Sequence, residues 1–227
     1  MKRVFLALIV LAACGRVLAA VGCTLNDPDR DIKRLFPKAT NYKTEFIEIR
    51  DRGDKELMKE IEKKLGDKLE PVYEKIDVPY AYYTILSKKE IIGYVHGVNQ
   101  KGRFGGMQLI LATDTDGKIL DFYYQKLSSP ESKKFRSKEF TVLFKSLSLK
   151  DFYTVDLKKK IKDPSKKNSN DYHATLRGLK KNLILLDEFK LKNKYDKYFN
   201  KAKKENGKDK DDKSDNAKEN ENEKNKK

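Results

Sequence analysis

The pattern that most constrains this fold is a strand-turn-strand sequence that runs from Met107 to Gln125. Apolar residues alternate with other residues before and after the polar segment Asp114–Gly117, and a period of two is typical of strands that bury one face. A glycine in such a short polar segment favours a tight turn. The pattern therefore predicts an antiparallel hairpin that reverses at Asp114–Gly117.

Other segments predict further strands and three helices. Residues 81–86 and 90–98 are rich in Tyr, Ile and Val, which predicts a second hairpin. Residues 54–69 and 137–147 carry apolar residues at helical spacing. Leucines recur at helical spacing after Thr175, so we expect a third helix to begin there. Four strands with segregated helices predict an α+β fold, in which helices pack on one face or at one end of an antiparallel sheet.

The N-terminus predicts export and a lipid anchor. Lys2 and Arg3 precede an apolar run over residues 4–13, which is shorter than the roughly 20 residues of a membrane-spanning helix but typical of a signal peptide. The sequence Leu11-Ala12-Ala13-Cys14 fits a bacterial lipoprotein cleavage box. We therefore expect residues 1–13 to be removed and Cys14 to carry the lipid, outside the cytoplasm at the cell membrane or outer membrane.

Two alternatives to this anchor remain open. Cys23 also follows small residues and could be the acylated cysteine, although Arg16 would then lie inside the apolar segment. An ordinary secretory peptide could instead be cleaved after Ala19 or Ala20. Arg16 counts against this alternative as well.

Composition sets the domain boundaries and the classes of partner. The chain has 227 residues, of which 38% are hydrophobic, so it can bury the core of one domain. We expect a tether over residues 14–34, a folded domain over residues 35–192 and a disordered tail over residues 193–227 that is rich in Lys, Glu and Asn. The net charge of +16 favours anionic lipid head groups or acidic partners. Nucleic acid is not expected, because no motif for binding it is present.

Six short motifs then stand in a fixed order along the chain: Leu35-Phe36-Pro37-Lys38-Ala39, Ile92-Gly93-Tyr94, Asp114–Gly117, Ser128-Ser129-Pro130, Phe140–Leu147 and Ala174-Thr175. In these motifs the chain resembles the FMN-binding domain family, which includes the peripheral flavin subunits of the sodium-translocating NADH:quinone reductase and of the Rnf complex. The resemblance covers roughly residues 35–189. It implies a flavoprotein that takes part in electron transfer with membrane-bound redox partners.

The resemblance also implies where FMN would lie. The implied cofactor-binding residues are Ser128, Ser129, Pro130, Tyr172, His173, Ala174 and Thr175. In the family a flavin transferase esterifies FMN to the threonine of a Ser-Gly-Ala-Thr motif, and Thr175 matches that threonine. Tyr172 and His173 stand where the family has Ser and Gly. A helix start offers free N–H groups to a phosphate, so we expect FMN at Thr175, either as an ester or reversibly bound, with His173 nearby.

Other candidate chemistry is limited. His96 is expected to be structural, because a metal site built from histidines would need at least three converging ligands. Asp114, Asp116 and Asp121 resemble part of a calcium loop, but Gln125 stands where that loop requires a bidentate glutamate. Three functions stay open: an extracytoplasmic FMN carrier, a flavin-free surface lipoprotein of the same fold that binds a partner or acts as a scaffold, and a basic protein held at an anionic membrane.

Overall fold

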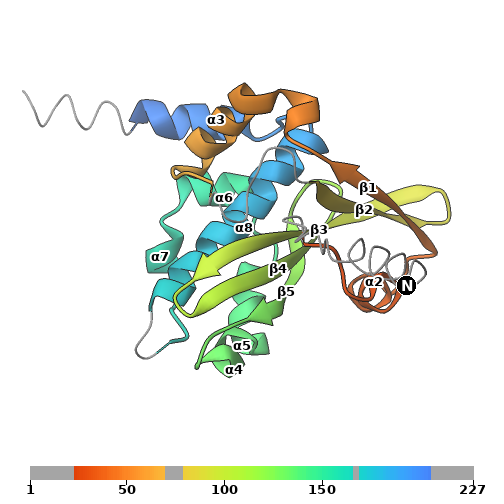
Figure 1. The fold of residues 1–227 in the computed structure, drawn as a ribbon, viewed down its shortest axis with the longest axis horizontal. Coiled ribbons are helices and arrows are strands. Elements are labelled where there is room, and N and C mark those ends of the chain that lie inside the picture. The colour runs from red at the N-terminus through yellow and green to blue at the C-terminus, as the bar shows by residue number, and fades with distance from the viewer. Residues whose placement is uncertain (1–22, 70–78, 166–168, 206–227) are drawn as a thin grey trace, which may run out of the picture.

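The computed structural model describes residues 23–69, 79–165 and 169–205. Its centre is a five-stranded antiparallel sheet in which each strand pairs with the next one in the chain (Figure 1). The strands are β1 (Asn41–Ile47), β2 (Tyr80–Ser87), β3 (Glu90–Gly102), β4 (Gly105–Thr113) and β5 (Ile119–Leu127). The predicted α+β class and antiparallel sheet are confirmed.

The hairpin between β4 and β5 forms as the alternation predicts. Leu111 pairs with Phe122 in the register of the two strands, and both side chains are buried. At the turn the Asp114 carboxylate accepts hydrogen bonds from the backbone N–H groups of Asp116 and Lys118, at 2.9 and 2.8 Å. Gly117 adopts a positive φ of 82°, a conformation that glycine takes without steric cost. The aspartate and the glycine together close the turn.

Strand β1 was missed by the sequence patterns. It pairs with β2 along its whole length, from Asn41 opposite Leu86 to Ile47 opposite Tyr80. Within β1, Ile47 is buried, but most of the other side chains are exposed. Because an edge strand packs on few neighbours, its sequence carries little alternation of apolar and polar residues.

Helices surround the sheet (Figure 1). They include α2 (Pro28–Leu35), η1 (Arg50–Arg52), α3 (Asp54–Leu65), α4 (Ser132–Phe135), α5 (Lys138–Thr141), η2 (Val142–Phe144), α6 (Leu149–Thr154), α7 (Leu157–Lys160) and α8 (Ser169–Phe189), and residues 196–205 are helical as well. The helix expected over residues 137–147 is the shorter pair α5 and η2. None of the helices in the described part of the chain is long and apolar enough to cross a bilayer.

The two faces of the sheet carry separate hydrophobic cores. The larger core lies under α8 and includes Leu109, Phe122 and Leu179. The smaller core lies on the opposite face and includes Ile32 of α2 with Tyr83 and Ile110. The expectation that helices cover one face or one end of the sheet was therefore wrong, since α2 covers the second face.

The folded region begins earlier than expected. Residues 23–34 were expected to be part of a tether, but Cys23, Leu25 and Ile32 are buried in the smaller core. Gly97 allows this packing, because a Cβ atom at that position would lie 2.6 Å from the backbone oxygen of Cys23. The domain therefore starts no later than residue 23 rather than at residue 35.

The folded region also ends later than expected. Tyr195 lies inside the segment expected to be a tail, yet it is buried, and its hydroxyl donates to the backbone oxygen of Asp116 at 2.7 Å. The buried Lys64 pairs with Glu188 at 3.0 Å and with Asp196 at 2.8 Å, which ties α3 to residues beyond α8. The boundary expected at residue 192 is therefore wrong. Residues 206–227 lie outside the described part of the chain.

We expect Gly93→Ala to destabilise the fold by about 3 kcal/mol, because overpacking a core is costly. A Cβ atom at Gly93 would lie 2.2 Å from the backbone oxygen of Thr113 on β4, and a strand backbone cannot move aside cheaply. Gly66→Ala is the control. Gly66 has a φ of +78° and open space around it, so alanine there should cost only about 1 kcal/mol. Urea unfolding measures both, and equal losses would contradict the close contact.

Candidate functional site: the cleft beside helix α8

Helix α8 lies directly on the sheet and presents two different sides. Gly178 permits the close approach, because a Cβ atom there would lie 2.8 Å from Cδ1 of Leu109. Asn182 donates to the backbone oxygen of Leu109 at 3.3 Å, and Lys181 donates to that of Asn99 at 2.5 Å. The side that faces the sheet is therefore held by polar contacts as well as by apolar packing.

Thr175 lies on the side that faces the sheet. Helix α8 begins at Ser169, so Thr175 stands in its second turn and not at its start, which corrects the sequence prediction. Its hydroxyl donates to the backbone oxygen of Asp171 at 2.8 Å and lies 2.7 Å from the Tyr124 hydroxyl. The Thr175 side chain is fully buried. An ester between this oxygen and FMN does not fit the arrangement, because the hydroxyl would lose its hydrogen bond to Asp171 and its fully buried oxygen would have to become accessible.

The other motif residues divide between the two sides of the helix. Tyr172 is buried, and its hydroxyl donates to the backbone oxygens of Ile161 and Leu157 at 2.6 and 3.2 Å. Ala174 is buried as well, whereas His173 is exposed. Of the residues Tyr172 to Thr175, only His173 is therefore accessible to a ligand.

The loop Ser128-Ser129-Pro130 comes near the start of α8. The tip of the hairpin between β3 and β4 links them: the Arg103 N–H donates to the Asp171 carboxylate at 2.8 Å, and Ser128 lies beside Gly105. The structure thus brings together segments that the sequence singled out. The acidic group at their meeting point is buried, however, and a carboxylate repels a phosphate.

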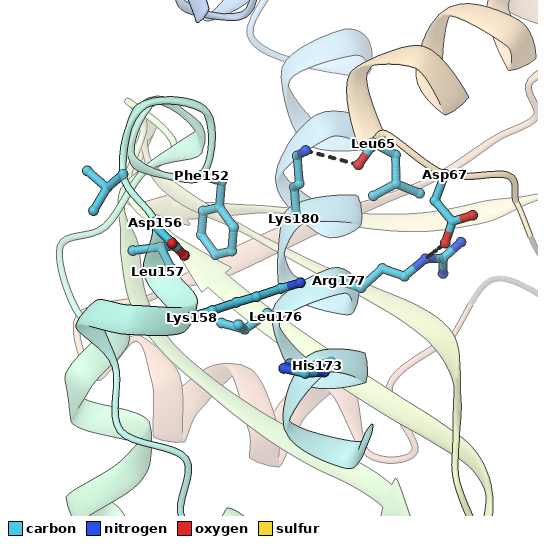
Figure 2. A pocket seen from close by; sticks show the side chains of 11 residues that line it. Leu65, Asp67, Phe152, Asp156, Leu157, Lys158, His173, Leu176, Arg177 and Lys180 are labelled. Carbon is cyan, nitrogen blue, oxygen red and sulfur yellow. Dashed lines mark hydrogen bonds and ion pairs between the residues drawn. The ribbon is translucent and has the colours of Figure 1, made fainter. Parts of the chain in front are cut away.

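A cleft of about 570 Å³ opens on the other flank of α8 (Figure 2). Its apolar wall consists of Leu65, Phe152, Val155, Leu157 and Leu176. Its polar residues are Asp67, Asp156, Lys158, His173, Arg177 and Lys180. We call this feature the α8 cleft. Its volume lies within the roughly 300 to 1,000 Å³ that small-molecule sites occupy.

Two cations of the α8 cleft are available to an anionic ligand. Lys180 donates to the backbone oxygen of Leu65 at 3.0 Å, which leaves further N–H groups of its ammonium for another partner (Figure 2). Burial lowers the pKa of Lys180 to about 8, so most of it remains charged near neutral pH. The exposed Lys158 points across the cleft toward α8. Both side chains can therefore approach one bound anion.

Arg177 has a different role in the same cleft. Its guanidinium donates to the Asp67 carboxylate at 2.8 Å, to the side-chain oxygen of Gln100 at 2.6 Å and to the backbone oxygen of Lys68. These contacts tie the end of α3 to α8 and to β3. Arg177 therefore lines the cleft as a structural residue, and its guanidinium is already paired with Asp67 rather than available to a ligand.

Few features of the sequence indicate the α8 cleft. Of its residues, His173 was expected to bind the cofactor and Lys180 to add positive charge near the phosphate, whereas Lys158 belongs to a lysine-rich segment that resembles an ordinary solvated surface. The cleft has no local signature, because its walls come from α3, α6, α7 and α8.

The His96 side chain is buried in the core. Its ring stacks on Tyr82 with a centroid distance of 4.0 Å. Burial lowers the pKa of His96 to about 3. Within the described residues no group of three His, Cys, Asp or Glu side chains is placed to hold a metal ion.

We expect Thr175→Val to destabilise the protein by about 1 to 3 kcal/mol, because the buried Tyr124 hydroxyl loses its partner. Thr154→Val is the matched control. Thr154 also donates to a backbone oxygen one helical turn earlier, at 3.0 Å, but its side chain is exposed, so its loss should change stability by less than about 0.5 kcal/mol. Thermal unfolding measures both variants, and equal effects would contradict the buried contact.

We expect His96→Phe to make stability less sensitive to acid. The ring has a pKa of about 3 in the fold and 6.5 when exposed, so the unfolded state binds more protons between these values. Stability that is present above pH 6.5 is therefore lost as the pH falls toward 3. Removing the imidazole should reduce the difference in unfolding free energy between about pH 7 and about pH 4 by about 3 kcal/mol. Urea unfolding at both pH values tests this, and an unchanged difference would show that His96 does not carry the effect.

No protein-family model and no curated protein matches this chain. The side chains of the α8 cleft decide what it can bind. They form an apolar wall, with two approachable lysines and an exposed histidine, around a cleft of about 570 Å³.

Proposed function

We propose that this chain is a lipid-anchored, extracytoplasmic flavin-binding protein that holds FMN reversibly in the α8 cleft and takes part in electron transfer. The FMN is not esterified to Thr175. The observation that carries the proposal is the combination of an apolar wall with Lys158 and Lys180 around one cleft of suitable size. The order of the motifs that resemble the FMN-binding domain family is the second support.

The chemistry of the cleft fits the two ends of FMN. The isoalloxazine ring is flat and largely apolar, and Phe152, Leu157 and Leu176 offer it an apolar surface. The phosphate is dianionic near neutral pH, and Lys158 and Lys180 can donate to it as point charges. His173 lies on the same side of α8 and can donate a further hydrogen bond.

In this proposal the protein binds the flavin, orients it and shields it from water, and the flavin carries the electrons. Arg177 keeps the wall of the cleft in place through its contacts with Asp67 and Gln100. The apolar side chains exclude water from one side of the ring. The carboxylate of Asp156 at the edge of the cleft disfavours a second anion, which limits the site to one phosphate.

The expected anchor at Cys14 remains part of the proposal. Cys14 lies outside the described residues, but the alternative, Cys23, has a buried side chain that packs against Gly97. Burial also raises the pKa of the Cys23 thiol to about 12, which disfavours the thiolate needed for acylation. These facts support Cys14 as the lipidated residue. The lipid at Cys14 would then hold the protein at the membrane that contains its redox partner, so the two proteins would meet there.

A flavin-free function for the same fold is the second candidate. It is favoured by the burial of Thr175 and by the Asp171 carboxylate near Ser128, where the family resemblance implies FMN. In that case the α8 cleft would hold another apolar anion or a side chain of a partner protein. The experiment below separates the two candidates.

We expect the purified protein to quench added FMN fluorescence saturably. Lys158→Gln and Lys180→Gln should each weaken binding by about tenfold, because each removes a charge-assisted hydrogen bond worth about 1.5 to 3 kcal/mol. Lys89→Gln, an exposed lysine in the turn between β2 and β3, is the matched control and should bind like the wild type. Thr175→Val should also leave affinity unchanged.

Three results would contradict this function. Absence of saturable quenching would leave the flavin-free candidate. A fluorescent band on a denaturing gel after co-expression with a flavin transferase, abolished in Thr175→Val, would show an ester instead of reversible binding. Loss of affinity in Thr175→Val with no loss in either lysine variant would move the site from the α8 cleft to the buried face of the helix.

A further inference from the structure

Two neighbouring aliphatic side chains are exposed on a rigid part of the surface. Val142 and Leu143, on η2, are 51% and 46% exposed. Their neighbours Phe140 and Phe144 point the other way, into the larger core, where their rings lie 5.2 Å apart. Because these two phenylalanines fix the segment, Val142 and Leu143 cannot turn inward. The protein therefore keeps a small apolar projection in contact with solvent.

Cations surround this projection. Lys138 lies one helical turn before Val142, and Lys145 follows Leu143 by two residues; both lysines are exposed. Exposed Arg136 and Lys133 come from the same stretch of chain. The carboxylates in this region belong to the exposed residues Asp121 and Glu139 and to Glu131, which pairs with Lys134. Positive charge exceeds negative charge around the apolar pair.

A small cleft adjoins the pair. Its volume is about 220 Å³, and its lining includes three cationic residues, Arg34, Arg136 and Lys138, together with Thr141 and one carboxylate, that of Asp121. Arg34 lies over the ring of Tyr123 at 4.4 Å, and Arg136 donates to the backbone oxygen of Tyr124. Both guanidinium groups are thereby positioned at the same edge of the sheet. The cleft is too small for a nucleotide but large enough for a phosphate group, and it shares no lining residue with the α8 cleft.

We infer that the segment from Lys138 to Lys145 is a contact surface for an anionic phospholipid membrane. Val142 and Leu143 enter the boundary between head groups and acyl chains, and Arg34, Arg136 and Lys138 surround the phosphate of one lipid. This arrangement of an apolar projection with a cationic border is the one that interfacial segments use. The inference does not depend on FMN binding.

The size of the surface favours a membrane over a protein partner. A stable protein interface buries roughly 800 Å² on each side, and its centre usually contains large anchors such as Tyr or Trp. The two aliphatic side chains of Val142 and Leu143 provide neither an area of that size nor a large aromatic anchor. A bilayer accepts such a shallow insertion, and the lysines can extend their charged ends to the head groups while their stems lie along the apolar pair.

The chain contains no tryptophan, so a single introduced tryptophan reports on one position. Leu143→Trp, made in the full chain with Cys14→Ser to prevent acylation, is mixed with phosphatidylcholine vesicles with or without phosphatidylglycerol. With the anionic vesicles its emission should shift to shorter wavelength and become shielded from iodide. Ile91→Trp is the matched control, because Ile91 is 47% exposed on the far hairpin. Its emission should remain that of a water-exposed ring.

The charge of the surface is tested separately. Replacing both Lys138 and Lys145 by Gln should weaken binding of Leu143→Trp to anionic vesicles by about 30-fold at low salt, as expected for two lysines near an anionic surface. Replacing Lys43 and Lys89 by Gln, two exposed lysines elsewhere, should leave binding nearly unchanged.

Several outcomes would overturn the inference. The first is no shift of Leu143→Trp with anionic vesicles, and the second is an equal shift of Ile91→Trp, which would show recruitment by the apolar N-terminal run alone. A shift of equal size with neutral vesicles would remove the role of the lysines and the cleft. A shift that grows with protein concentration in the absence of vesicles would make the surface a contact between copies of this chain.

Discussion

The contact between helix α8 and the sheet is the constraint on which the rest of the structure depends. Gly178 lets the helix approach Leu109, while Asn182 and Lys181 donate to backbone oxygens of the strands. Thr175 adds a buried link to Tyr124. Because the side facing the sheet is fully occupied, a ligand can reach α8 only from its flank. The position of the α8 cleft follows from this division.

Sequence patterns predicted the parts of the fold that are set by local burial. The hairpin of β4 and β5 forms as predicted, and its turn is closed by Asp114 and Gly117, although residues 109–113 are buried on both faces of the sheet. The start of α8 was not predictable in this way. Its first turn, from Ser169 to Tyr172, is mostly polar, and it is stabilised by distant contacts such as the one between Arg103 and Asp171.

The domain ends and the candidate site were mispredicted for a related reason. Tyr195 is an isolated apolar residue in a polar segment, and its hydroxyl binds the turn at Asp116. Cys23 follows a run that resembles a signal peptide, and its burial depends on the space left by Gly97 on β3. Composition averages over such residues. The α8 cleft likewise depends on how α3, α6 and α7 are placed around α8, and no local pattern encodes that placement. The sequence did predict the helix itself, and it predicted His173 as a residue of the binding site.

The simple strand order has a consequence for how the chain acquires its structure. Short turns join β2 to β3, β3 to β4 and β4 to β5, so these four strands can form hairpin by hairpin with little loss of chain entropy, whereas β1 pairs with β2 across residues 48–79. Its covering helix α8 comes much later in the chain, yet it must pack on β3 and β4. The strands are therefore synthesised before their larger apolar face can be covered. A chain that stops short of α8 would expose that face and associate with other chains rather than retain a partial fold.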